Sequence, residues 1–196
     1  MTHSLSLPAN VLHLNYYNFE RRSLLPQTPD ALWKIESGIV RSLTWSEDGR
    51  VIGLGVWGAG DVVGSSISTS SPYNVECLTK VRAKSLPRLQ WPYELDAILR
   101  HVQYGEELLQ IVQCKYVEVA VWRMLNWLAK RFGQEVEDGM LIDMTLTHQE
   151  IAEMIGSTRV TVTRTLNKFV KHSVIQKQDR HWLLLADRQP FWHYEI

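Results

Sequence analysis

Cysteine is scarce in this chain of 196 residues, in which Cys77 and Cys114 are the only two. Two cysteines cannot build a disulfide framework, a Cys-based zinc site or an iron–sulfur cluster within one chain. Histidine is missing from residues 14–100, although the chain has 7 histidines. A metal enzyme built on strands of that region would need imidazole and carboxylate ligands on facing strands. We therefore expect neither a disulfide-rich secreted domain nor a metal-dependent enzyme.

An excess of one charge and a long apolar run are also missing. Lys plus Arg number 21 and Asp plus Glu number 21, so the formal net charge is zero, which excludes a histone-like basic protein and an acidic tail. No apolar run approaches the ~18 residues of a membrane helix, and no basic segment followed by an apolar one opens the chain. Because 45% of the residues are hydrophobic, we expect a globular protein with a packed core. Because neither a secretion signal nor a membrane helix is found, we expect it in the cytoplasm with no membrane partner.

Short apolar runs separated by turn residues fill the N-terminal half. Three of these runs predict strands: Ala31–Glu36, Ile39–Trp45 and Val51–Trp57. Asp48-Gly49, between two of the runs, predicts a hairpin, because glycine adopts a positive φ without strain. Of the 11 glycines, 7 lie between Gly38 and Gly64, where tight turns need them. The sequence therefore predicts a small β-roll or barrel within residues 1–90.

A helical period begins after Pro92 and predicts a long helix within residues 91–116. Apolar residues recur at spacings of 3 and 4 as far as Tyr116, with Gly105 as the one interruption. This period leaves two interpretations open: a helix that faces the core of its own chain, or the seam of a parallel two-helix homodimer. The candidate dimer interface consists of Leu95, Ile98, Val102, Leu109 and Val112.

The last eighty residues predict a helix over 117–131, closed by Gly133, and then two short helices joined by a turn. Thr147 and Glu150 form a capping box at the start of the first short helix, and Gly156 supplies the turn. Ser157 is expected to cap the second short helix, which covers 158–171. The expected buried positions are Ile151, Ala152 and Ile155 in the first and Val162, Leu166, Phe169 and Val170 in the second. Two helices joined in this way predict a helix-turn-helix, with a short strand at 143–146 before it and a wing of strands 174–177 and 182–185 after it.

The second short helix carries one continuous outer stripe of Arg159, Val160, Thr163, Arg164 and Asn167. Residues 157–182 hold six Lys or Arg against one Asp, a net charge of +5 inside a neutral chain. Such a concentration of positive charge is the footprint of a nucleic-acid binder. A solvated basic face is the alternative, and it leaves the valine in this stripe unexplained. The pattern therefore favours recognition of double-stranded DNA.

The chemistry of each side chain suggests its contact with DNA. Arg159 and Arg164 can each donate two hydrogen bonds to guanine O6 and N7, and Val160 can contact a thymine methyl group. Thr163 and Asn167 can reach a base edge or a phosphate. The expected phosphate contacts are Thr158 and Lys168 on the helix and Lys177, Arg180 and His181 on the wing.

A β-roll, a heptad helix and a winged helix-turn-helix, in this order, resemble the Crp/Fnr family of bacterial transcription regulators over residues 30–186. The resemblance rests on Ile35–Arg41, Asp48-Gly49, Gly60–Gly64 and Leu146–Leu166. Residues 156–164 look most like the cyanobacterial global nitrogen regulator branch. The resemblance implies an α+β fold with a cyclic-nucleotide-binding-like β-roll at 1–90, a dimerisation helix at 91–116 and a DNA-binding domain at 117–196.

The resemblance also implies how the protein works: as a homodimer on a palindrome with GTA…TAC-like half-sites, recruiting or blocking RNA polymerase, without catalytic activity. Cyclic-nucleotide members of the family grip the phosphate with an Arg-Ser pair, whose position here falls near Ser71-Pro72. A buried phosphate without that cation would be uncompensated, so we expect no response to cAMP. The same missing arginine leaves 2-oxoglutarate or another small effector open. Two alternatives also stay open, namely an effector-independent regulator with a degenerate β-roll and a small-molecule sensor that acts through a protein partner.

Overall fold

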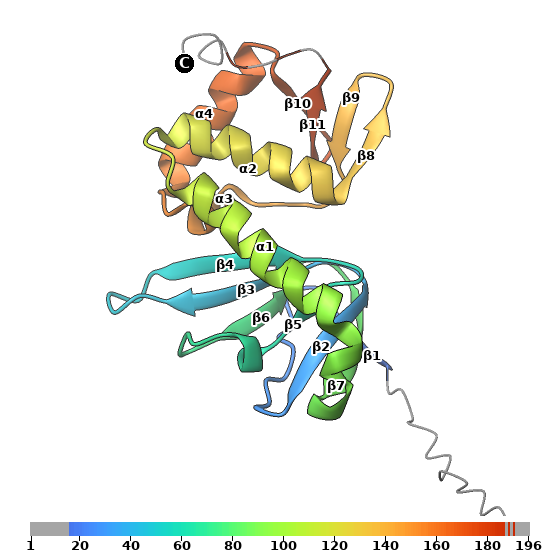
Figure 1. Cartoon of the computed structure of the whole chain (residues 1–196). Coiled ribbons are helices and arrows are strands. Elements are labelled where there is room, and N and C mark those ends of the chain that lie inside the picture. The colour runs from blue at the N-terminus through green and yellow to red at the C-terminus, as the bar shows by residue number, and fades with distance from the viewer. Residues whose placement is uncertain (1–15, 187, 189, 191–196) are drawn as a thin grey trace, which may run out of the picture.

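The computed structural model of the chain describes residues 16–186, 188 and 190. A strand-rich part and a helix-rich part lie at opposite ends of the molecule, and helix α1 (Leu95–Val112) connects them (Figure 1). The fold is α+β, as the sequence predicts. The portions of the predicted β-roll and DNA-binding domain that fall on residues 1–15, 187, 189 and 191–196 lie outside the described residues.

The strand-rich part is a β-roll made of two antiparallel sheets. The first sheet has the order β1-β7-β2-β5, with strands Tyr16–Phe19 (β1), Val81–Pro87 (β7), Ala31–Ser37 (β2) and Val62–Val63 (β5). The second has the order β4-β3-β6, with strands Val51–Trp57 (β4), Val40–Trp45 (β3) and Asn74–Cys77 (β6). A 3-10 turn, η1 (Ser65–Ile67), follows β5. The three predicted strands and the Asp48-Gly49 hairpin are confirmed, and Gly49 has a φ of 80°.

Helix α1 follows a 3-10 segment, η2 (Arg88–Glu94), and packs one face against the β-roll. The residues on that face are Ala97, His101, Tyr104, Leu108 and Ile111. The predicted stripe is a different face, because Leu95, Val102, Leu109 and Val112 are all exposed. Ile98 is half-buried and packs against the β-roll, whereas Leu99 beside it is exposed. The helix ends before Tyr116, which instead caps the next helix.

The helix-rich part contains α2 (Val117–Phe132), α3 (His148–Ile155) and α4 (Arg159–Lys171). An antiparallel sheet of order β10-β11-β9-β8 completes it, with strands Ile175–Gln178 (β10), His181–Leu185 (β11), Gly139–Ile142 (β9) and Gly133–Val136 (β8). The strand predicted at 143–146 is wrong, since the ladder ends at Ile142. Met144 and Leu146 are buried in the helical core from a loop, and this burial produces the apolar alternation that resembles a strand.

Three details of the helix ends differ from the sequence prediction. Thr158 rather than Ser157 caps α4, and its Oγ1 accepts a hydrogen bond from the backbone N–H of Thr161 at 3.2 Å. Val170 is 42% exposed and lies off the inner stripe of α4, which Thr165 joins instead. Gly133 ends α2 in an extended conformation, and a Cβ at this position would lie 2.2 Å from the carbonyl oxygen of Ala129. Close approach of the backbone therefore explains this glycine, not a left-handed cap.

Candidate nucleic-acid interface

Helices α3 and α4 form the predicted helix-turn-helix. Thr147 Oγ1 accepts a hydrogen bond from the backbone N–H of Glu150 at 3.1 Å, and the Glu150 carboxylate accepts one from the N–H of Thr147 at 2.6 Å. This is the capping box predicted from the sequence. Gly156 has a φ of 65° and ends α3 in the left-handed region, which glycine adopts without strain. The turn then directs the chain into α4.

The outer face of α4 is open to solvent. Arg159, Arg164 and Asn167 are exposed, and Val160 is 68% exposed. A valine in that position contributes little to any core of its own chain, whereas its methyl groups suit apolar contact with a thymine methyl group. The arginines project from the same face and have the bidentate donor geometry that guanine recognition requires.

Thr163 lies deeper than its neighbours in the predicted stripe. Its Oγ1 lies 2.8 Å from Nδ1 of His148, the first residue of α3. Burial lowers the pKa of His148 below its ordinary value of 6.5, and the positive charges of Lys177 and Arg159 lower it further. The imidazole is therefore neutral at pH 7. The sequence alone does not single out His148. It contacts Thr163, which lies 15 positions further along the chain on the next helix, and no local pattern marks this contact.

The wing carries the remaining basic side chains. Strands β10 and β11 pair from Ile175 to Leu184, and the two residues between them, Asp179 and Arg180, make the turn. Lys177 lies with its Nζ 5.8 Å from the centre of the Trp182 ring. A hollow of about 640 Å³ lies between the wing, the helix-turn-helix and the β-roll. Its lining includes His148, Arg159, Lys177, Arg180 and Trp182, together with Arg22 and Arg41 of the β-roll. The fold therefore brings cations from the recognition helix and the wing together around one hollow.

Two of the predicted phosphate contacts already have partners within the chain. Thr158 Oγ1 caps α4 and lies 2.9 Å from Thr161 Oγ1. Lys168 Nζ lies 2.9 Å from a carboxylate oxygen of Glu118 in α2, so part of its charge is compensated. His181 is half-buried on β11, beside the wing turn. These three residues are thus less available to DNA than the arginines of α4.

Known proteins share this helix-turn-helix and the overall fold. Residues 120–191 match the family model described as the Crp-like helix-turn-helix domain. The regulatory protein CysR of Synechococcus elongatus is 43% identical over 165 residues, which cover 82% of this chain and 79% of that protein. A global nitrogen regulator from Nostoc is 52% identical over 48 residues, 24% of this chain and 22% of that protein. A CRP-family transcriptional regulator from Thermus thermophilus has the same fold, with a TM-score of 0.75 at 22% identity over 87% of this chain and 92% of that one.

The similarity to CysR extends over most of both chains, and the helix-turn-helix built by α3 and α4 is the part that the family model describes. The short match to the nitrogen regulator agrees with the branch that the recognition helix resembles. The chain belongs to the Crp/Fnr family of transcription regulators, which bind DNA through a helix-turn-helix and are not enzymes.

Proposed function

We propose that this regulator binds as a homodimer to a palindromic site with GTA…TAC-like half-sites, one recognition helix in each of two successive major grooves. The observation that carries the proposal is the open face of α4, where Arg159, Val160 and Arg164 stand side by side. Two arginines and an exposed valine form a combination that reads guanine edges and thymine methyl groups. The 52% identity to global nitrogen regulators in a 48-residue segment supports the choice of half-site.

The exposed face of α1 supports the dimer. Leu95, Leu99, Val102, Leu109 and Val112 are exposed along it, and their spacing of 4, 3, 7 and 3 follows a heptad repeat. A row of this length is a larger apolar patch than a monomer usually leaves in water. Pairing two α1 helices along this row would bury it and place two copies of α4 about one helical turn of DNA, ~34 Å, apart.

The loop after β5 supports a regulator that does not respond to cAMP. The backbone N–H of Ser65 donates to the side-chain oxygen of Gln27 at 2.9 Å, and the hydroxyl of Ser66 donates to the carbonyl of Pro29. Donors that a bound phosphate would need are thus already engaged by the chain itself. The dimer would recruit or block RNA polymerase in the cytoplasm, and an effector such as 2-oxoglutarate remains to be tested by its influence on DNA affinity.

Fluorescence anisotropy on two labelled duplexes tests the proposal. One duplex carries GTA-N8-TAC, the other has the same bases in scrambled order, and each is titrated across a salt series. We expect the palindrome to bind more tightly by ~10³ or more, with log Kd rising linearly with log salt. Equal binding to both duplexes would contradict the proposed site. Affinity independent of salt would instead favour a protein partner for the helix-turn-helix, because only phosphate neutralisation releases counterions.

A further inference from the structure

The helix-turn-helix is seated directly on the β-roll. Helix α3 lies against strand β4 at Gly53, where an added Cβ would lie 2.9 Å from Cγ and 3.0 Å from Cα of Met154. One buried apolar cluster also includes Val56 of β4, Leu125 of α2 and Ile151 of α3. The β-roll and the DNA-binding domain therefore share a packed core within one chain.

A buried arginine of the β-roll reaches across this contact. Arg41 in β3 is 6% exposed, and its guanidinium pairs with Glu76 on the neighbouring strand β6 at 2.7 Å. Its Nη1 donates to Glu153 of α3 at 2.6 Å. One guanidinium thus joins a carboxylate of the β-roll to a carboxylate of the helix-turn-helix.

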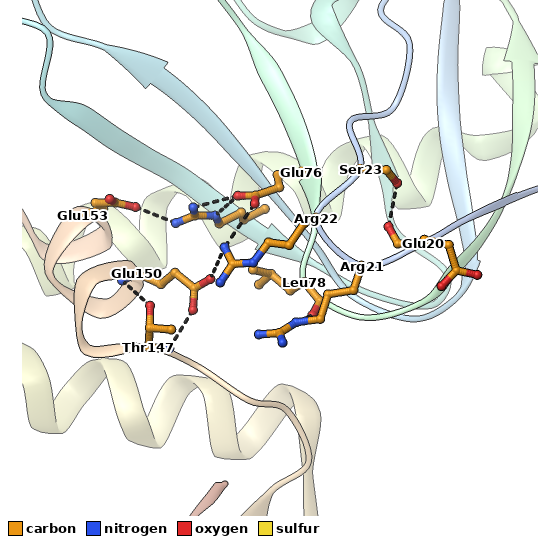
Figure 2. A network of polar contacts seen from close by, with 10 residues as sticks. Glu20, Arg21, Arg22, Ser23, Glu76, Leu78, Thr147, Glu150 and Glu153 are labelled. Carbon is orange, nitrogen blue, oxygen red and sulfur yellow. Dashed lines mark hydrogen bonds and ion pairs between the residues drawn. The ribbon is translucent and has the colours of Figure 1, made fainter.

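A second arginine connects the same β-roll carboxylate to the start of α3. Arg22 Nη1 lies 3.1 Å from Glu76 and 2.8 Å from Glu150, and Figure 2 shows these contacts converging between strand and helix. Glu150 is 2% exposed and is also the capping-box residue that accepts the N–H of Thr147. Its two carboxylate oxygens therefore serve two purposes, the first turn of α3 and the contact with the β-roll.

We propose that Arg22 and Arg41 are positioning residues for DNA recognition, which hold α3 at one place on the β-roll and thereby fix where α4 presents its outer face. This inference rests on the proposed function, because it concerns the orientation of the recognition helix. Helix α4 follows α3 after the Gly156 turn and packs against it, so a displacement of α3 displaces α4. A shift of α3 along the β-roll would separate Glu150 and Glu153 from the two arginines.

Four side chains of the network are largely buried, whereas Arg22 is 46% exposed and closes the network at its solvent edge. The five side chains are Arg22, Arg41, Glu76, Glu150 and Glu153, with two positive and three negative charges, and the N-terminus of α3 lies beside the carboxylate of Glu150. Removing Arg41 leaves the carboxylates of Glu76 and Glu153 facing one another at a largely buried contact, and breaking a buried pair on one side is far more disruptive than replacing both partners. Direct contact with DNA is the alternative, and it suits Arg41 poorly, because its side chain is 8% exposed.

The test compares Arg41→Gln with Arg50→Gln in the full-length protein. Arg50 pairs with Asp48 at the exposed hairpin, so the control removes the same charge outside the network. Two readouts are needed: hydrogen exchange of the amides in α3 and β4 without DNA, and anisotropy on the palindromic duplex across a salt series. For Arg41→Gln we expect faster exchange in both elements and about tenfold weaker binding with an unchanged salt slope. Arg50→Gln is expected to change neither.

A second variant keeps the test decisive if Arg41→Gln does not fold. Glu153→Gln removes the helix side of the same pair and is by itself expected to give faster exchange in α3 and β4 and weaker binding with an unchanged salt slope. Where Arg41→Gln folds, the double variant leaves no unpaired charge at that contact, so its loss of affinity should be smaller than the sum of the two single losses. A salt slope lower by about 1 with unchanged exchange would overturn the inference, because it would identify a phosphate contact. Unchanged exchange and unchanged affinity would overturn it as well. If the wild-type protein does not prefer the palindrome, the proposed function fails, and the exchange data alone decide on the network.

Discussion

The indole of Trp57 and the imidazole of His101 stack in parallel, with ring centres 3.8 Å apart and planes inclined by 9°. Trp57 ends β4 and His101 lies on α1, so this stack fixes the long helix on the β-roll. The guanidinium of Arg131, from α2, lies 3.6 Å from the centre of the Tyr104 ring and pairs with Asp61 of the β-roll. Three parts of the chain therefore meet at one aromatic cluster.

We expect the stack to make folding stability depend on pH. Burial lowers the pKa of His101 below its ordinary value of 6.5, so the folded protein holds this imidazole neutral. The unfolded chain binds the proton more readily, and the stability is therefore fully present above about pH 6.5 and is lost as the pH falls from there towards the folded pKa. Urea unfolding at pH 7.5 and 5.5 measures the loss. The pKa of His148 is lowered as well. His101→Phe, which keeps a ring over Trp57, should therefore reduce the difference in unfolding free energy between the two pH values without abolishing it.

Loss of the carboxylate beside Arg131 should destabilise the protein strongly. Asp61→Asn leaves a guanidinium that is buried among aromatic rings without its direct ion-pair partner, and burial already lowers the pKa of Arg131. A buried ion pair broken on one side costs about 3–5 kcal/mol. Denaturant unfolding checks this, with Asp48→Asn in the exposed hairpin pair as the matched control that leaves the midpoint in place. Equal midpoints for the two variants would show that the aromatic rings alone hold the cation.

Arg164→Ala should weaken binding to the palindrome by about 1–3 kcal/mol and relax the preference at one base pair, if the guanidinium contacts guanine in two places. Anisotropy on duplexes with single base-pair changes measures both effects. Lys177→Ala on the wing is the control, because Lys177 is a proposed phosphate contact. It should lose the same affinity for palindromic and scrambled DNA, with a salt slope lower by about 1. The same uniform loss in Arg164→Ala would mean that this arginine contacts only phosphate.

Val102→Glu should shift the protein towards monomer and weaken binding to the palindrome in parallel. The valine lies in the middle of the exposed α1 row, where two copies would place their new carboxylates close together. Light scattering gives the mass and anisotropy gives the affinity. Gln103→Glu adds the same charge at the next position, off the row, and should leave both unchanged. A dimer that survives Val102→Glu would show that the α1 row is not the interface.

Local patterns in the sequence predicted the helix-turn-helix well. The capping box of Thr147 and Glu150 and the turn at Gly156 depend on residues a few positions apart, so their side chains and backbone geometry are sufficient to define them. The strand predicted at 143–146 failed for the opposite reason. Apolar alternation reports which side chains are buried, and here Met144 and Leu146 are buried under helices instead of in a sheet.

Contacts between distant residues could not be predicted. Arg41 and Glu153 are 112 positions apart, and neither belongs to a motif that names the other. The heptad period left the orientation of α1 open, because the packed face with Leu108 and the exposed face with Leu109 are both apolar. Only the position of the β-roll against the helix distinguishes them.

The close fit of Gly53 against Met154 has a consequence for any titration with salt. Van der Waals contact is indifferent to ionic strength, and the ion pairs of Arg41 beside it are largely buried, so salt screens them far less than it screens exposed charges. Adding salt should therefore strip the protein from DNA while the chain keeps its internal architecture. The protein would leave its operator as an intact, rigid body, ready to bind again at once when the salt is diluted.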